Sequence, residues 1–208
     1  MEKNNSRILK RYTDITTLIN VLVAKKITLI DPQNWDDKND SYFMSAYKRH
    51  KNLKSLLATC FTSAPETYHH WKIFSGNNSG VCIVFLNTQL QERISNKNGL
   101  KSDYVEYKTL EELGKISPEI NNLPFTKRYQ FKDEKEFRII YESSLEDLPF
   151  YDLDIELEDI DRIFLSPWLH SSLVNNLKQL LKSIPGCAKL KITRSTLIGN
   201  ENWKRFAN

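Results

Sequence analysis

The most constraining feature of this sequence is a continuous apolar run at residues 81–85, which follows a turn-rich segment at residues 75–80. A short apolar run bounded by a turn is typical of a central strand that is buried on both faces. A second run, residues 56–62, has the same character. Because strands of this kind need paired neighbours and cover on both faces, the chain is expected to build a central sheet with helices packed against it.

The remaining hydrophobic pattern predicts a mixture of strands and helices rather than a regular alternation. Further strands are predicted at residues 8–12, 27–30, 104–107, 137–141, 160–165 and 188–193. Helices are predicted after a cap at residues 13–16 and over residues 42–56, 109–123 and 170–183. This order predicts an α+β fold in which a central mixed or antiparallel sheet is flanked by helices. Since no repeat or linker interrupts residues 1–208, we expect a single domain.

Composition excludes several functional classes. The 208 residues include only six glycines, too few and too scattered to form a phosphate-binding loop or a dinucleotide fingerprint. Three cysteines are an odd number without a closely spaced pair, so they are expected to be buried, reduced thiols. The first five residues are polar, and no apolar run approaches the ~20 residues of a membrane span. These features lead us to expect a soluble, cytoplasmic protein.

The first candidate site lies in the acidic segment that begins the strand predicted at residues 137–141. An alternation of two would place Glu134, Glu136 and Arg138 on one face of this strand. If that face lines a pocket, like charge raises the pKa of one carboxylate, while Arg138 lowers that of the other. Such a pair suits acid–base chemistry or stabilisation of a developing cation. The alternative is an exposed strand face with a surface salt bridge.

Two further groups have the chemistry of ligand contacts. Arg11, near the end of the first strand, can fork onto a phosphate or carboxylate while Tyr12 stacks beside it. Trp71, which follows two histidines, suits stacking on a base or ring and equally suits closing the edge of a core. Adjacent histidines point to different sides of a regular element, so they are poor joint metal ligands. We therefore expect no metal site there.

Acidic residues elsewhere allow a different chemistry. Asp36, Asp37 and Asp40 offer oxygen ligands for a hard cation, but helix capping or a turn fits them better. Residues 133–135 match a short acidic-x-Lys element of metal-dependent nucleases, for which Asp103 or Asp37 would supply the second acid. A magnesium-dependent nuclease is therefore one alternative function.

Short segments along almost the whole chain resemble a bacterial family, domain of unknown function 2971. The resembling segments are residues 9–12, 31–37, 60–62, 71, 80–85, 134–139, 163–168 and 194–197. This resemblance implies a bacterial domain that is sometimes encoded near defence genes, including phage defence, or toxin–antitoxin genes. It implies no established activity.

A second resemblance concerns the order of three motifs. An arginine on the first strand, a hydroxyl residue on a middle strand and a late Glu-x-Glu are similar to the motif order of ADP-ribosyltransferases. The resemblance implies that Arg11 holds a phosphate of NAD and that Thr62 orients the catalytic glutamate. It also implies that Glu136 binds the nicotinamide ribose and Glu134 orients the acceptor. Tyr12, Trp71 and Arg138 would complete the cofactor contacts.

Three functions therefore stay open from the sequence. The chain is an NAD-dependent ADP-ribosyltransferase acting on a protein or nucleic acid, a non-catalytic binding protein such as an antitoxin or sensor, or a magnesium-dependent nuclease. The mild net charge of +4 permits contact with nucleic acid through a local patch without requiring it. No membrane partner is expected.

Overall fold

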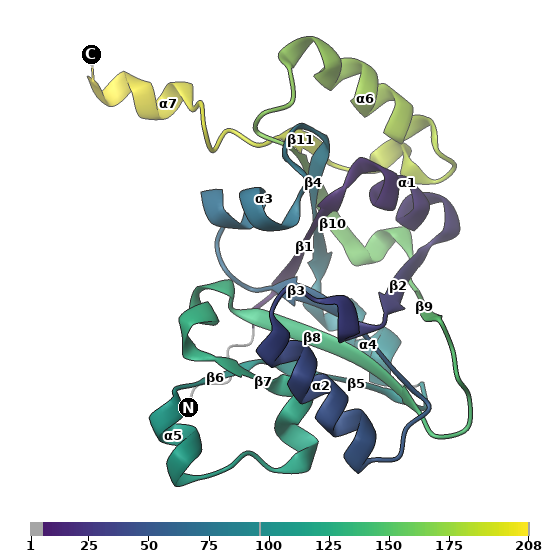
Figure 1. Ribbon diagram of the computed structural model, residues 1–208. Coiled ribbons are helices and arrows are strands. Elements are labelled where there is room, and N and C mark those ends of the chain that lie inside the picture. The colour runs from purple at the N-terminus through teal and green to yellow at the C-terminus, as the bar shows by residue number, and fades with distance from the viewer. Residues whose placement is uncertain (1–5, 96, 208) are drawn as a thin grey trace. The chain divides into compact units, whose positions relative to one another are not determined.

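The computed structural model describes residues 6–95 and 97–207. Their contacts group into two compact units. Unit 1 consists mainly of Ile27–Ala64 and Leu90–Asp154, and unit 2 of Arg7–Lys26, Pro65–Gln89 and Ile155–Asn208. Both units combine helices with mostly antiparallel strands, which confirms the predicted α+β class with a mixed sheet (Figure 1). The expectation of a single domain stays a prediction.

Unit 1 is organised around the long strand β8. The strands lie in the order β9, β2, β3, β8 and β5, and β3 and β5 both pair antiparallel with β8. Their bounds are β2 Lys26–Ile30, β3 Ser55–Thr62, β5 Leu100–Tyr104, β8 Glu136–Ser143 and β9 Phe150–Asp154. A separate parallel pair joins β6, Glu106–Lys108, to β7, Thr126–Arg128.

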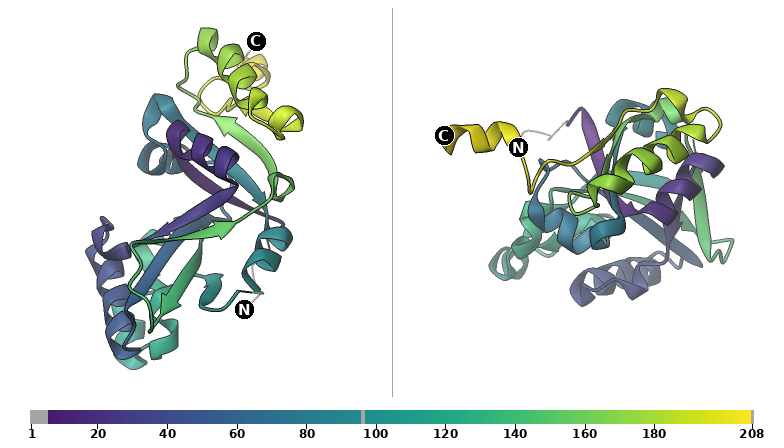
Figure 2. Two further views of the ribbon diagram at one scale, coloured as in Figure 1. Left: turned by 90° about the vertical axis from the view of Figure 1, so that its right-hand side faces the viewer. Right: turned by 90° about the horizontal axis from the view of Figure 1, so that it is seen from above.

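The helix α2, Lys38–His50, covers this sheet and forms its apolar core (Figures 1 and 2). Asp37 caps it, accepting hydrogen bonds from the backbone N–H groups of Asn39 and Asp40, so the capping interpretation of this aspartate is confirmed. Met44 and Tyr47 project from one helix face onto β3 and β8. The other helical segments of the unit are α4 Asn87–Ser95 (from residue 90 on), α5 Leu110–Lys115, and the 3-10 helices η1 Pro32–Asn34, η3 Ile120–Phe125 and η4 Tyr129–Glu134.

Unit 2 has strands in the order β11, β10, β4 and β1. Its central strand β4 is buried along almost its whole length between β1 and β10, as the apolar run predicts. The strands are β1 Ile8–Asp14, β4 Gly80–Leu86, β10 Ile160–Leu165 and β11 Ile192–Arg194. The helices are α1 Ile15–Ala24, α3 Tyr68–Phe74, α6 Ser171–Ser183 and α7 Glu201–Lys204. No described helix has the length and apolar character that a membrane span requires.

Several predicted boundaries were wrong. The helix predicted at residues 42–56 begins earlier, at Lys38, and ends at His50, because Asn52 turns the chain with a positive φ of 51°. The helix predicted at residues 109–123 breaks into α5 and η3, and the strand predicted at 188–193 retains only Ile192–Arg194. The strand β9 and the helix α4 were not predicted, because neither carries a strong periodic apolar pattern.

Candidate active site in unit 1

The candidate site forms where β8 begins. Glu136 is the first residue of this strand and pairs with Thr62 at the end of β3. Lys135, just before it, adopts a left-handed conformation with a φ of 43°, so Glu134 belongs to η4 and not to the strand. The predicted face of three residues was therefore wrong for Glu134, and only Glu136 and Arg138 share it. Both are buried, so this is not an exposed strand face.

Arg138 is the centre of a buried ion network. Its guanidinium forms two bonds to Asp40, from Nη1 to Oδ1 at 2.9 Å and from Nη2 to Oδ2 at 2.8 Å. It also donates from Nε to Glu136 Oε1 at 2.8 Å, with Nη2 lying 2.7 Å from the same oxygen. A bond of 2.7 Å from Nη1 to the carbonyl of Pro124 completes the set.

All five N–H donors of this guanidinium are therefore engaged. The Trp35 ring lies 4.7 Å from the guanidinium carbon and adds a cation–π contact. A saturated guanidinium favours a role in positioning Glu136 and Asp40 over the predicted contact between Arg138 and a cofactor.

Lys127 on β7 is the second cation of the cluster. Its ammonium lies 2.7 Å from Glu134 Oε2, 3.2 Å from Glu136 Oε2 and 3.7 Å from Asp40 Oδ2. When all groups are ionised, three carboxylates face two cations, which leaves a net charge of −1. The Glu134 side chain is the most exposed member, at 21%. This end of the cluster is therefore where a ligand has access.

The cluster displaces the pKa values of its carboxylates in opposite directions. Burial alone would raise the pKa of Glu136, but the charges of Arg138 and Lys127 outweigh it and lower the value to about 2. Burial raises the pKa of Glu134 and of Asp40, and the neighbouring cations compensate only in part. The charges of the three carboxylates raise the pKa of Lys127 against its own desolvation. The two pKa values are thus displaced in opposite directions, as predicted, but the main cause for Glu134 is burial and not like charge.

Backbone contacts fix the segment that carries the two glutamates. The Thr62 hydroxyl donates to the carbonyl of Glu134 at 2.5 Å and accepts from the N–H of Ala64 at 2.9 Å. The N–H of Glu136 donates to the Tyr107 hydroxyl at 2.8 Å. Thr62 therefore positions the glutamate segment through its backbone, and not through the Glu136 carboxylate as the motif order implies.

Trp71 and Tyr12 lie together in the core of unit 2. The Trp71 ring is fully buried, packs edge-on to Tyr12 at 5.1 Å between centroids, and donates from Nε1 to Glu66 Oε1 at 2.7 Å. Cys82 and Val84 of β4 complete this cluster. Of the two interpretations of Trp71, the geometry favours closure of a core, since neither ring face is open to a ligand.

Arg11 projects from the other side of β1. In the pairing of β1 with β4, Tyr12 lies opposite Cys82 and Arg11 opposite Ile83. Because neighbouring strand residues point to opposite faces, Arg11 cannot share one face of the strand with Tyr12. The predicted pair, in which Tyr12 stacks beside a ligand held by Arg11, is therefore divided between two faces.

Sequence reasoning missed Asp40 and Lys127 as members of the cluster. Asp40 carried a signal, because its spacing from Met44 and Tyr47 places a carboxylate on an apolar helix face, where it requires a buried cation. Lys127 lies on a three-residue strand without hydrophobic periodicity and offered no such signal.

The features that favoured a nuclease are not assembled here. Asp133, Lys135 and Asp103 are exposed, and no group of three or more His, Cys, Asp or Glu side chains within residues 6–95 and 97–207 is arranged to hold a metal ion. The three cysteines are free thiols, two of them buried.

Comparison with family models confirms part of the sequence resemblance. Residues 70–139 match the family described as "Protein of unknown function (DUF2971)". The match runs from α3 to the middle of β8 and includes Trp71, Glu134 and Glu136. The resembling segments before residue 70 and after residue 139 lie outside it. No curated protein matches the chain.

Among solved structures, the chain is similar to DarT from Thermus sp. 2.9. The complex with carba-NAD+ has 13% identity and a TM-score of 0.46, covering 92% of this chain and 96% of DarT. The complex with ADP-ribosylated ssDNA has 12% identity and a TM-score of 0.48, covering 94% and 97%. Because a fold does not fix a function, a likeness of this size carries no functional conclusion.

Proposed function

We propose that this chain transfers an ADP-ribosyl group from NAD to a nucleophilic group of a protein or nucleic acid, with Glu136 and Glu134 as the catalytic pair. The observation that carries the proposal is the opposite displacement of their pKa values around Lys127. Pairs of carboxylates whose environments drive their pKa values apart are typical of acid–base sites.

In the proposed reaction, the bond between ribose C1′ and the nicotinamide nitrogen breaks, and the acceptor forms a new bond to C1′. Positive charge develops on the ribose as nicotinamide leaves with the bonding electrons. A preorganised carboxylate stabilises such a charge in a site that excludes water. Glu136 suits this role because it is buried and its lowered pKa keeps it ionised at neutral pH. The net charge of −1 in the cluster acts in the same direction.

Glu136 retains capacity for a substrate contact. A carboxylate oxygen has two acceptor positions. Arg138 occupies Oε1 through two nitrogens, Lys127 lies 3.2 Å from Oε2, and the Cys60 thiol, a weak donor, also bonds the carboxylate. A ribose hydroxyl is therefore proposed to approach Oε2.

Glu134 is proposed to accept the proton of the acceptor. It is the most accessible carboxylate of the cluster, and its raised pKa makes it the stronger base of the pair. The balance is then complete: NAD and the protonated acceptor yield the ADP-ribosylated acceptor, nicotinamide and one proton.

The predicted cofactor contacts in unit 2 are supported by the motif order of the sequence. That Arg11 holds a phosphate of NAD stays a prediction of the motif order. Tyr12 and Trp71 stay predicted cofactor contacts, although both belong to a packed core. Loss of NAD affinity in Arg11→Ala, with wild-type thermal stability, is the outcome that this prediction requires.

The test is incubation of the purified chain with labelled NAD and cell extract, with nicotinamide release followed in parallel. We expect Glu136→Gln and Glu134→Gln each to lower the transfer rate by roughly 10²- to 10⁴-fold, as loss of a positioned acid or base does. Glu158→Gln, at an exposed position, is the matched control and should keep the wild-type rate.

Two results would contradict the proposal. One is equal transfer by wild type and the folded Glu136→Gln variant. The other is wild-type protein that releases no nicotinamide with any extract while it copurifies with a stable partner, which would favour the non-catalytic binding protein.

A further inference from the structure

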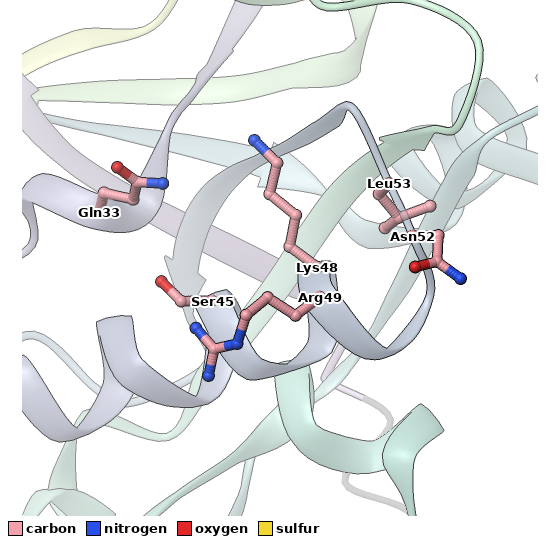
Figure 3. A pocket seen from close by; sticks show the side chains of 6 residues that line it. All are labelled: Gln33, Ser45, Lys48, Arg49, Asn52 and Leu53. Carbon is pink, nitrogen blue, oxygen red and sulfur yellow. The ribbon is translucent and has the colours of Figure 1, made fainter.

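A second candidate site lies at the C-terminal end of α2, where an open pocket of about 710 Å³ is lined largely by hydrogen-bond donors (Figure 3). Its lining residues are Gln33, Ser45, Lys48, Arg49, Asn52 and Leu53. None of the six is acidic, and two carry positive charge. The volume falls within the range typical of sites for small molecules, about 300–1,000 Å³.

Most of the lining belongs to one face of the helix end. Lys48 and Arg49 follow Ser45 by three and four residues, which places these three along one side of α2, and Asn52 follows just beyond the end of the helix. This side differs from the side of Asp40, Met44 and Tyr47, which faces the core. Gln33 on η1 lies across from the helix, as Figure 3 shows. The pocket therefore has two walls, and both supply polar groups.

The two cations have no acidic partner. Neither Lys48 nor Arg49 forms an ion pair with any carboxylate in the part of the chain that the structure describes. The Arg49 guanidinium carbon lies 5.7 Å from the centroid of the exposed Tyr42 ring. Two unbalanced positive charges at the mouth of one pocket favour an anionic ligand.

Positive side chains suit the negative end of the helix dipole, but hydrogen bonding to the helix carbonyl groups does not account for them. Lysine and arginine often bind the last free carbonyl groups of a helix. Here the backbone does so, because Asn52 adopts a left-handed conformation and its N–H donates to the carbonyl of Arg49 at 3.1 Å. The N–H of Leu53 donates to the carbonyl of Lys48 at 3.0 Å. This Schellman motif leaves the side-chain donors of Lys48 and Arg49 available for a ligand.

We propose that this pocket binds a phosphate-bearing ligand of nucleotide size. Lys48 and Arg49 supply charge-assisted hydrogen bonds to the phosphate, and Ser45, Asn52 and Gln33 add neutral ones. Leu53 offers apolar surface to the organic part of the ligand. The proposal does not depend on the proposed transferase activity, because none of the six lining residues belongs to the Glu136 cluster.

The test is titration calorimetry of the full chain at about 150 mM salt with two probes, tripolyphosphate and ADP. At this ionic strength exposed charges are largely screened beyond about 8 Å, so diffuse attraction is suppressed. We expect binding with a Kd below 1 mM for at least one probe. Tighter binding of ADP would identify a nucleotide as the source of the phosphate, and equal binding would identify the phosphate groups alone. Both results support the site.

Variants decide whether the pocket is responsible. Lys48→Gln/Arg49→Gln keeps two good helix formers and should weaken binding by at least about tenfold, since the phosphate loses two charge-assisted partners. Lys51→Gln/Lys54→Gln removes the same charge from exposed neighbours outside the pocket and should weaken it less than twofold. Arg11→Ala removes the residue predicted to hold a phosphate of NAD and should bind both probes as wild type does, which separates this site from the proposed active site.

Three outcomes would overturn the proposal. Neither probe binds at 10 mM, the two double variants lose affinity equally, or Arg11→Ala abolishes binding. The second outcome would indicate a diffuse positive surface, and the third would place the phosphate at the predicted NAD site.

Discussion

Residues that the sequence predicted as parts of one site lie in different environments in the two units. In unit 1, Glu136 and Arg138 enter a buried network of charges with Asp40 and Lys127. In unit 2, Trp71 and Tyr12 enter an aromatic core that is completed by Cys82 and Val84. The ion network of unit 1 holds charged groups in a low-dielectric interior, which displaces their pKa values. The aromatic core of unit 2 removes apolar surface from water. Only the first has properties expected of a catalytic centre.

The largest effect is expected for the cation of the network. Arg138→Ala leaves Asp40 and Glu136 buried without their guanidinium partner, which should lower the free energy of unfolding by about 3–5 kcal/mol. Arg162→Ala breaks a half-exposed pair with Asp161 and should cost less than about 1 kcal/mol. Urea denaturation of both variants measures the difference. A loss below 1 kcal/mol in Arg138→Ala would mean that the ion pairs of Arg138 contribute little to the free energy of unfolding.

The free energy of unfolding at acidic pH should depend on the ionisation of Glu136. Its pKa falls from 4.5 in the unfolded chain to about 2 in the folded one, so its contribution is fully present above pH 4.5 and is lost as the pH falls towards 2. A displacement of this size corresponds to roughly 3 kcal/mol at 1.36 kcal/mol per pKa unit. The raised pKa values of Glu134 and Asp40 act in the opposite direction. The folded state favours the protonated form of these two groups, so the protein becomes less stable as the pH rises and they ionise.

Denaturation of wild type and Glu136→Gln between pH 5 and pH 2.5 measures this contribution. The gap between their unfolding free energies should narrow as the pH falls, whereas Glu158→Gln should follow the wild type throughout. A gap that stays constant over this range would contradict the lowered pKa of Glu136.

A smaller effect is expected for the aromatic core. Trp71→Phe keeps a ring in the cluster but removes the N–H that donates to Glu66 and leaves a small cavity. We expect a loss of about 1–3 kcal/mol, measured by urea denaturation. The same variant tests the predicted NAD contact, because a stacking role for Trp71 requires NAD affinity to fall more in Trp71→Leu than in Trp71→Phe.

The smallest effect is expected for the hydroxyl of Tyr12. This oxygen is buried, and the polar group beside it is the Cys82 thiol, which forms only weak hydrogen bonds. Tyr12→Phe therefore removes a buried polar group that is only weakly paired, and it should change the unfolding free energy by less than about 1 kcal/mol, towards greater stability. Marked destabilisation in thermal denaturation would show that the hydroxyl has a partner, and loss of NAD binding would support the predicted ligand contact.

The sequence predicted those parts of the fold that depend on local spacing. The apolar run at residues 81–85 became the buried strand β4, and Asp14 caps α1 as its position before Leu18 and Leu22 indicates. Predictions failed at boundaries set by single backbone conformations. The end of α2 is decided by the left-handed Asn52, and the start of β8 by the left-handed Lys135. Residues other than glycine adopt the left-handed conformation in only a few per cent of cases, so the sequence does not predict it at a given asparagine or lysine.

For the candidate site, the sequence by itself determined that Glu136 and Arg138 share a strand face, because the period of two is a local property of extended backbone. Only the tertiary structure decided that this face is buried and that Asp40, 98 residues away in sequence, binds the same guanidinium. It also buried Trp71 in an aromatic core, whereas the sequence left stacking on a ligand and closure of a core equally open. Whether a side chain is buried, and which partner it binds, depends on which distant segments pack together. The free energy of that packing cannot be read from the residue spacing within any one segment.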